Sequence, residues 1–265
     1  LFPSVRFGCE MAILHYLANQ KHTTLAKLLS DAPHESIRLS GLLQGTNEEV
    51  LVELRKLLDQ GYRSFKLKVG LNLQDDIEKT QAVIKMINGQ ALLHLDVNQG
   101  WSLNHAIQFV EEAGLAFIEY VEEPFQDINM IEEFVMRTTV PVALDESLTG
   151  MNFNEIKSID GVDLLILKPT IIGSIEKTVK YIKEGTRLAI SPVVSSLFES
   201  SLGILTLANL AGLTAHINYA GLDTVKWFKE DLLINPLKFD HGRMDISKRT
   251  VQSKDINFKL LTKIS

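Results

Sequence analysis

The chain has 265 residues, of which 45% are hydrophobic and 23% are charged. These values are typical of a folded protein with one large core. The 27 basic and 33 acidic side chains give a formal net charge of −6, and no basic run could neutralise a phosphate backbone. Nucleic-acid binding is therefore not expected.

The cysteine content and the apolar runs indicate the compartment in which the protein is found. Cys9 is the single cysteine, so no disulfide can form within the chain, and no apolar run is long enough to span a bilayer. We expect a cytoplasmic protein with no membrane partner. The sequence starts at Leu1 inside an apparent core helix, so we also expect residues upstream to be missing.

From about residue 35, short strand-like runs alternate with longer amphipathic patterns. The predicted strands are SIRLSGLL (36–43), RSFKLKVG (63–70), ALLHLDVN (91–98), AFIEYVEEP (116–124), PVALDES (141–147), DLLILKP (163–169) and RLAISPVVSS (187–196). Helices are predicted between them, for example over 47–61 and 75–89. This serial order of strand and helix predicts parallel strands.

Each predicted strand is apolar until its end, where a charged or hydroxyl side chain follows. These residues are Lys68, Asp96, Glu122, Asp145, Lys168 and Ser195, at separations of 28, 26, 23, 23 and 27 residues. One further step each way reaches RLSGLL and AGLDT (220–224), which makes eight units. The pattern predicts an α/β fold, a TIM-like barrel, with catalytic groups at the carboxyl ends of its strands.

Two lysines stand in the FKLKVG stretch. On a strand, Lys66 and Lys68 share one face. In an antiparallel sheet with one wet face they would simply be solvated, but in a parallel barrel they point into the mouth. Desolvation and mutual repulsion lower an ammonium pKa there, so such a lysine can act as a base.

Three carboxylates follow consecutive strands. Asp96, Glu122 and Asp145 would repel one another unless a cation lay among them, and all-oxygen ligands favour Mg²⁺ over Zn²⁺. The alternative is that these acids cap the following helices. Glu122 and Glu123 both adjoin Pro124, and the alternation does not decide which is the ligand.

Lys168 ends an otherwise aliphatic strand, four units from Lys68 in a ring of eight. We expect the two lysines to face each other across the cavity. A base, a divalent cation and an opposing lysine fit abstraction of a proton next to a carboxylate, with the metal stabilising the enediolate.

The ordered segments KLKVG, LDVNQGW, EEP, ALDESL, LKPTIIGSIEK, FESSLG and GLDT, between Pro3 and Asp223, resemble the o-succinylbenzoate synthases. These enzymes belong to the muconate-lactonizing-enzyme-like branch of the enolase superfamily. The resemblance implies a (β/α)7β barrel that binds Mg²⁺, with Mn²⁺ as a substitute. It implies the following roles: Lys68 as acid/base, Lys66 as its electrostatic helper, Asp96, Glu122 and Asp145 as metal ligands, Lys168 as stabiliser of the enediolate, and Ser195, Ser196 and Asn98 as substrate-binding residues.

The implied reaction is a hydro-lyase step of menaquinone biosynthesis. It is the syn dehydration of 2-succinyl-6-hydroxy-2,4-cyclohexadiene-1-carboxylate to 2-succinylbenzoate. One lysine can serve both steps, because the base that takes the proton returns it to the departing hydroxide on the same face. The helix that FESSLG opens offers an N-terminus for the succinyl carboxylate, with helix capping as the alternative role of the serines.

The family normally carries an α+β capping domain before the barrel, and its sequence is largely absent here. We expect residues 1–224 to form the barrel and residues 225–265 to form a segment that would pack against the cap. The 265 residues alone are then expected to bind Mg²⁺ but to dehydrate the substrate poorly.

Other activities use similar residues. An N-acylamino acid racemase or a dipeptide epimerase would use Lys68 and Lys168 as two bases, although Val225 replaces the second acid of the DxD pair usual in dipeptide epimerases. A Schiff-base aldolase would use Lys168 as nucleophile and leave the carboxylates unexplained. A non-catalytic scaffold is a further alternative. The oligomeric state stays open.

Overall fold

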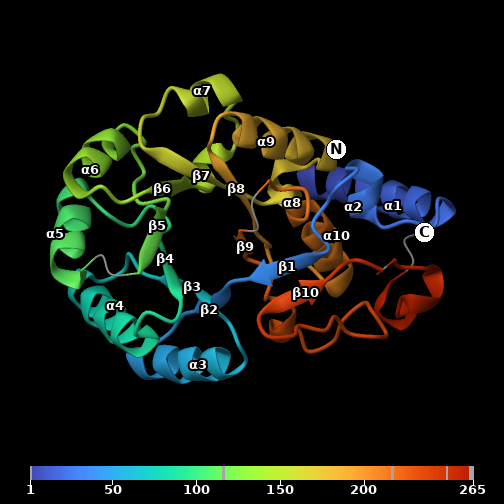
Figure 1. Cartoon of the computed structure of the whole chain (residues 1–265), viewed down its shortest axis with the longest axis horizontal. Coiled ribbons are helices and arrows are strands. Elements are labelled where there is room, and N and C mark those ends of the chain that lie inside the picture. The colour runs from blue at the N-terminus through green and yellow to red at the C-terminus, as the bar shows by residue number, and fades with distance from the viewer. Residues whose placement is uncertain (1, 115–116, 216–217, 249, 263–265) are drawn as a thin grey trace. The chain divides into compact units, whose positions relative to one another are not determined.

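The computed structural model describes residues 2–114, 117–215, 218–248 and 250–262 (Figure 1). The chain divides into two compact units. Unit 1 comprises Leu1–Leu39, Leu167–Thr186 and Pro192–Ser265, and unit 2 comprises Ser40–Ile166 and Arg187–Ser191. Unit 2 carries most of the predicted site.

Unit 2 is built on parallel strands that follow one another in chain order. These are β2 (Gly41–Leu43), β3 (Ser64–Lys68), β4 (Leu92–Asp96), β5 (Ile118–Glu122), β6 (Val142–Leu144) and β7 (Val162–Leu167), whose last residue belongs to unit 1. The sheet order continues to β8 (Ser191–Val194), giving seven strands. The predicted parallel βα repeat is thus confirmed.

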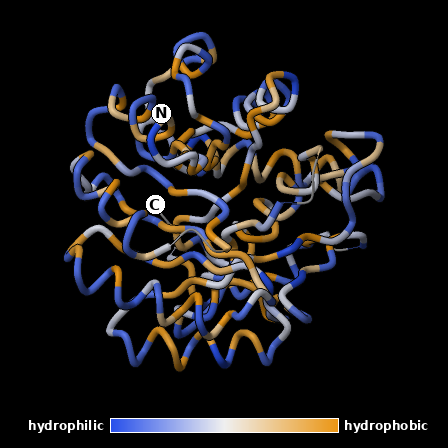
Figure 2. The backbone as a smooth tube through the Cα atoms, turned by 60° about the vertical axis from the view of Figure 1, so that its left-hand side comes forward, coloured by the Kyte–Doolittle hydropathy of each residue, from blue (hydrophilic) through white to orange (hydrophobic). Residues whose placement is uncertain are grey.

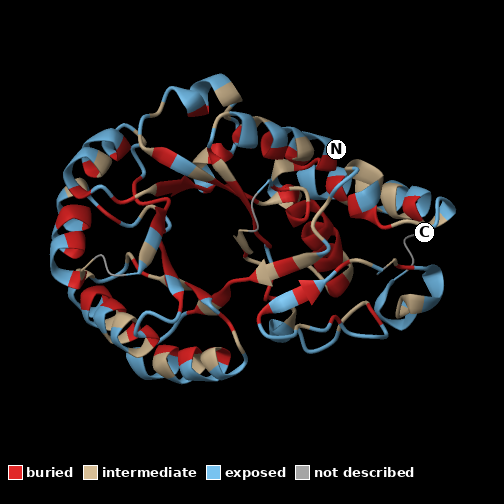
Figure 3. Cartoon of the chain, viewed as in Figure 1, coloured by how far each residue is buried: buried red, intermediate tan, exposed pale blue. Residues whose placement is uncertain are grey.

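Helices alternate with these strands and lie on their outer side in Figure 1. They are α3 (Asn47–Asp59), α4 (Leu73–Ile87), α5 (Leu103–Ala113), α6 (Met130–Thr138), α7 (Phe153–Lys157) and the 3-10 turn η1 (Glu146–Leu148). Figure 2 shows apolar and polar residues alternating along the helices, and Figure 3 shows buried and exposed faces to match. In α3, for example, Val50, Leu54 and Leu57 are buried, as the helical period requires.

Unit 1 combines helices with a small sheet. Its elements are α1 (Pro3–Gln20), α2 (Leu25–Leu29), β1 (Ser36–Leu39), α8 (Pro169–Ile172), α9 (Ile175–Arg187, of which the last residue falls in unit 2), most of β8, α10 (Ser201–Ala211), β9 (Tyr219–Ala220), η2 (Val225–Trp227), β10 (Arg243–Asp245), η3 (Ser253–Asp255) and η4 (Phe258–Leu260). In the sheet, β1 pairs in parallel with β9 and antiparallel with β10.

Several predicted strands differ in detail from the structure. The run over 36–43 is interrupted at Ser40, where the chain passes from β1 to β2. The run predicted from Arg187 begins too early, because α9 extends to Arg187 and β8 starts at Ser191. Ala116, the first residue of another predicted run, lies outside the described residues. The eighth unit forms only the two-residue strand β9.

The segment after residue 224 contributes β10, which pairs with β1 inside unit 1. The proposed division of the chain between residues 224 and 225 stays a prediction. Within the described ranges, every helix is too short or too polar to be a membrane-spanning candidate.

A half-buried histidine is expected to make unit 1 sensitive to acid. His15 of α1 places its Nε2 2.8 Å from the Thr206 hydroxyl of α10. Burial lowers the pKa of His15 from 6.5 to about 4. The unfolded chain therefore takes up a proton at a pH where the folded chain does not, so stability is lost as the pH falls from about 6.5 through about 4.

We expect the free energy of unfolding to fall across this pH window, and we expect His15→Gln to flatten part of that fall. Urea denaturation at several pH values between 7.5 and 4 measures both effects. An identical pH dependence in His15→Gln would contradict the role given to His15.

Candidate active site

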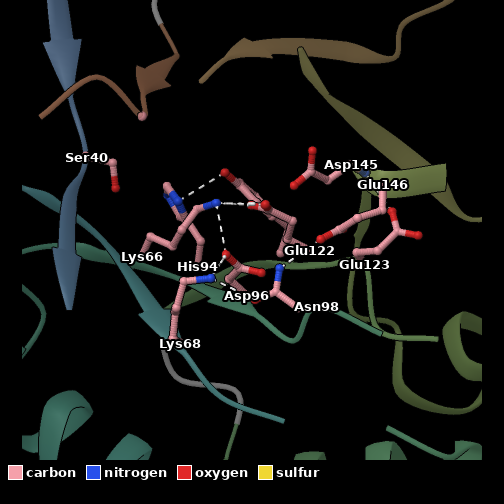
Figure 4. Close-up of polar contacts among 12 residues, drawn as sticks. Ser40, Lys66, Lys68, His94, Asp96, Asn98, Glu122, Glu123, Asp145 and Glu146 are labelled. Carbon is pink, nitrogen blue, oxygen red and sulfur yellow. Dashed lines mark hydrogen bonds and ion pairs between the residues drawn. The ribbon is translucent and has the colours of Figure 1, made fainter. Parts of the chain in front are cut away.

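The residues that end three neighbouring strands of unit 2 form one row. In the sheet register Lys68 of β3 is the partner of Asp96 on β4, which is in turn the partner of Glu122 on β5. Asp145 follows β6 directly and is buried. Figure 4 shows these side chains gathered with Lys66 at the same edge of the sheet.

Lys66 is the more buried of the two lysines in this cluster. Its Nζ is 2.7 Å from the Glu122 carboxylate and 3.3 Å from Asp96 Oδ2, and only 15% of its side chain is exposed. Burial alone would lower its pKa, but the carboxylates of Glu122 and Asp96 outweigh burial, and the pKa of Lys66 is raised. The expected lowering was therefore wrong for Lys66, because its neighbours are acids.

Lys68 is more accessible. Its side chain is 40% exposed, and its Nζ contacts Asp96 Oδ2 at 3.0 Å and Asn98 Oδ1 at 2.7 Å. The Asn98 amide also donates to Glu146 Oε1 at 2.9 Å, which fixes its orientation. Of the two lysines, Lys68 is the one that a bound molecule can more readily reach.

The two acids of the row differ in their electrostatics. Burial acts to raise the pKa of Asp96, but the ammonium groups of Lys66 and Lys68 outweigh it and hold this pKa below its usual value. For Glu122 burial prevails over the attraction of Lys66 and raises the pKa to about 7. The site is thus short of positive charge around Glu122.

Helix capping does not explain Asp96 or Glu122. The side chain of Ser102 caps α5, the helix after Asp96, and α6, the helix after Glu122, has Asn129 at its N-cap position. Asp145 stands at the N-cap position of η1, but its side chain makes no capping hydrogen bond. The capping alternative is therefore wrong for these three acids.

Glu122 and Glu123 have different surroundings. Glu122 is fully buried and faces Lys66. Glu123 is equally buried, but its carboxylate accepts hydrogen bonds from Gln99, Asp145 and Ser147. Glu123 has a left-handed backbone conformation, with φ 45°, so the alternation of side chains along the strand ends at Glu122. This change of conformation distinguishes Glu123 from Glu122, which the sequence alternation does not.

A second polar layer precedes the row along the strands: His94 and Tyr120 stand two residues before Asp96 and Glu122, and Ser64 stands four residues before Lys68. His94 Nε2 lies 2.9 Å from Ser64 Oγ and 3.0 Å from Glu119 Oε2, and its Nδ1 lies 3.0 Å from the Tyr120 hydroxyl. Burial, and then the charge of Glu122, raise the pKa of Tyr120, so this phenol stays protonated and can donate to His94. The sequence analysis missed this layer, although the two-residue strand period signals it.

The remaining predicted site residues belong to unit 1. Lys168 follows β7 at the N-cap position of α8. Ser195 is buried and bridges to Gly221, and the Ser196 hydroxyl donates to the Gly221 carbonyl at 3.0 Å. Lys68 and Lys168 lie in different units. That they face each other across the cavity therefore stays a prediction.

The N-terminus of α10, predicted as an anion site, already has an internal partner. The N–H of Ser201 donates to Asp231 Oδ1 at 2.8 Å, within unit 1. A helix N-terminus favours a carboxylate, and Asp231 supplies one.

The residues of unit 2 fit a bound divalent cation in their chemistry. Asp96 Oδ1 is buried without a hydrogen-bond partner, which is costly unless a cation or donor satisfies it. Across the described ranges, no three His, Cys, Asp or Glu side chains stand close enough together to hold a metal as they are. At present the Lys66 ammonium supplies the positive charge between Asp96 and Glu122.

Comparison with known proteins identifies relatives of two activities. The chain is 32% identical over 237 residues to an o-succinylbenzoate synthase of Aliivibrio fischeri, covering 87% of this chain and 68% of the relative. It is also 29% identical over 273 residues to the chloroplastic protein PHYLLO of Arabidopsis thaliana, covering 89% of this chain. The match spans only 16% of PHYLLO.

A third relative is the N-succinyl-L-Arg/Lys racemase of Bacillus cereus, which is 24% identical over 242 residues, or 89% of this chain and 63% of the racemase. Its crystal structure has a TM-score of 0.85 with this chain at 23% sequence identity, covering 92% of this chain and 67% of that one, which shows a shared fold. Residues 49–250 match the family described as enolase C-terminal domain-like. The chain therefore belongs to the enolase C-terminal domain-like family, whose α/β fold it shares.

Proposed function

We propose that the protein is an o-succinylbenzoate synthase, a Mg²⁺-dependent hydro-lyase of menaquinone biosynthesis that acts in the cytoplasm. The observation that carries this proposal is the row of Lys68, Asp96 and Glu122 at neighbouring strand ends, with Lys66 beside it. The similarity to a synthase at 32% identity over most of the chain supports this reaction within the family.

The two lysines have separate tasks in the proposal. Lys68 takes the proton next to the substrate carboxylate and returns it to the departing hydroxide on the same face. Its greater exposure and its contact with Asn98 support this role. Lys66, buried against Glu122 and Asp96, stays protonated and supplies fixed positive charge.

Asp96, Glu122 and Asp145 would hold the metal. Mg²⁺ prefers carboxylate oxygens, and Mn²⁺ accepts the same ligands. When bound, the cation supplies positive charge next to the carboxylate that becomes electron-rich as the proton leaves. The four donors that already hold Glu123 favour Glu122 as the third ligand.

Further residues would contact the substrate in the proposal. Lys168 would stabilise the charged form of the substrate, and Asn98 would orient Lys68 and contact the substrate. Ser195 and Ser196 would receive the succinyl carboxylate. The Ser196 hydroxyl lies 2.9 Å from the Thr224 hydroxyl, so it would contact both Thr224 and the substrate.

Racemisation of an N-succinylamino acid is the second candidate, favoured by the similarity to the Bacillus cereus racemase. It would use Lys68 and Lys168 on opposite faces. Epimerisation of dipeptides has less support, because the Asp223 carboxylate is paired with Lys226 Nζ at 2.9 Å and Val225 stands where a second acid would be.

An assay of both reactions tests the proposal. We expect the purified protein with Mg²⁺ to dehydrate 2-succinyl-6-hydroxy-2,4-cyclohexadiene-1-carboxylate, followed by ultraviolet absorbance, with a kcat/KM above that for N-succinylamino acid racemisation, followed by polarimetry. Excess chelator should stop the dehydration, and Mg²⁺ should restore it. Racemisation with the higher kcat/KM would make the second candidate the function.

A further inference from the structure

Glu123 is a buried acceptor for donors from two loops. Only 1% of the residue is exposed. Its carboxylate accepts from the N–H of Asp145 at 2.7 Å, from the N–H of Ser147 at 3.2 Å and from Gln99 Nε2 at 3.1 Å. The Ser147 hydroxyl is its fourth donor. An ionised carboxylate has only acceptor sites, so it satisfies all four donors.

The backbone of Glu123 also makes hydrogen bonds toward both loops. Its carbonyl accepts from the N–H of Gln99 at 2.7 Å, and its own N–H donates to Ala143 at 2.9 Å. The loop after β4 and the loop after β6 are therefore both attached to the residue that follows β5. All of these residues belong to unit 2.

The two attached loops carry groups of the candidate active site. The first contains Asn98, which accepts from Lys68 Nζ. The second contains Asp145 and Glu146, and Glu146 accepts from the Asn98 amide. A shift of the first loop would move Asn98, a partner of Lys68, and a shift of the second would move Asp145 and the Glu146 carboxylate that orients Asn98.

We propose that Glu123 is a positioning residue, which fixes the loop of Asn98 against the loop of Asp145 without touching metal or substrate. The inference deepens the proposed function and rests on it, since it assigns the two loops to the site of that reaction. Glu123→Gln tests it best, because the amide keeps the shape but turns an NH2 group toward at least one N–H donor.

The first measurement is amide hydrogen exchange in metal-free protein. We expect Glu123→Gln to speed exchange about tenfold in peptides covering residues 97–101 and 144–149, because a buried hydrogen bond to a charged acceptor is lost. The matched control is Glu122→Gln, one residue away and equally buried, which should leave the peptide over 144–149 at the wild-type rate. Wild-type exchange of both loops in Glu123→Gln would overturn the inference.

The second measurement is a double-mutant cycle on Mn²⁺ affinity, read from the electron paramagnetic resonance of the free ion. We expect Glu123→Gln to weaken binding about tenfold or more, as loss of a residue that orients a metal ligand does. In an Asp145→Asn background the same substitution should change the affinity less than about twofold, because Glu123 acts through Asp145.

The outcomes separate this inference from the proposed function. Additive losses in the cycle would make Glu123 a ligand in its own right and overturn the inference, and so would loosened loops with unchanged Mn²⁺ affinity. A wild-type protein that binds no Mn²⁺ would instead count against the proposed function. The exchange measurement, which needs no metal, would then still decide whether Glu123 holds the loops.

Discussion

Replacement of Lys68 by alanine is expected to lower kcat/KM for the dehydration by about 10³-fold or more. General acid–base groups contribute roughly 10² to 10⁴ each, and in the proposal this lysine acts in both proton transfers. Its 40% exposure allows the substitution without burying an unpaired charge, so the fold should persist. Steady-state kinetics with saturating Mg²⁺, together with circular dichroism, measure both expectations.

Lys66→Ala is the matched control for this prediction. It leaves the buried Glu122 without its ion pair and Asp96 with only its pair to Lys68, and loss of one partner from a buried pair costs about 3 kcal/mol or more. We therefore expect Lys66→Ala to lower the free energy of unfolding in metal-free protein, and to lower kcat/KM less than Lys68→Ala does. If Lys66→Ala were the more damaging to kcat/KM, the roles of the two lysines would be reversed.

The row of functional groups could be predicted because it depends on two simple periods. The βα repeat brings the carboxyl ends of successive strands to one edge of the sheet, and the strand period keeps alternate residues on one face. Lys68, Asp96 and Glu122 satisfy both periods and are in-register neighbours in the structure. His94 and Tyr120 obey the same rule two residues earlier and could have been predicted in the same way.

Features that depend on departures from these periods could not be predicted. Glu123 leaves the strand conformation one residue after Glu122, and only the folded loops show which donors surround it. The raised pKa of Lys66 depends on distances to carboxylates that lie 30 and 56 positions away in the sequence. Sequence periods place both lysines on one face, but they do not give these distances.

The loss of one metal ligand is expected to have an effect as large as the loss of the base. In the proposal, Asp145 supplies one of three carboxylates, and its main-chain N–H donates to Glu123. In the proposal, Asp96 and Glu122 would remain after Asp145→Ala, but both also face Lys66, which competes with a cation for them. Two shared carboxylates should hold Mg²⁺ poorly, since this ion demands near-ideal octahedral oxygen geometry.

We therefore expect Asp145→Ala to weaken Mg²⁺ binding by at least about 100-fold, measured by calorimetry, and to reduce the dehydration below detection at the Mg²⁺ concentration that just saturates the wild-type protein. Asp163→Ala, which removes an exposed carboxylate from β7 in the same unit, is the control and should leave both measurements at the wild-type values. Full activity of Asp145→Ala in chelator-treated buffer would show that Asp145 is not part of the site and that the reaction needs no metal. Weakened binding with unchanged turnover at saturating Mg²⁺ would support Asp145 as a ligand. It would also show that the other two carboxylates suffice for turnover once the ion is bound.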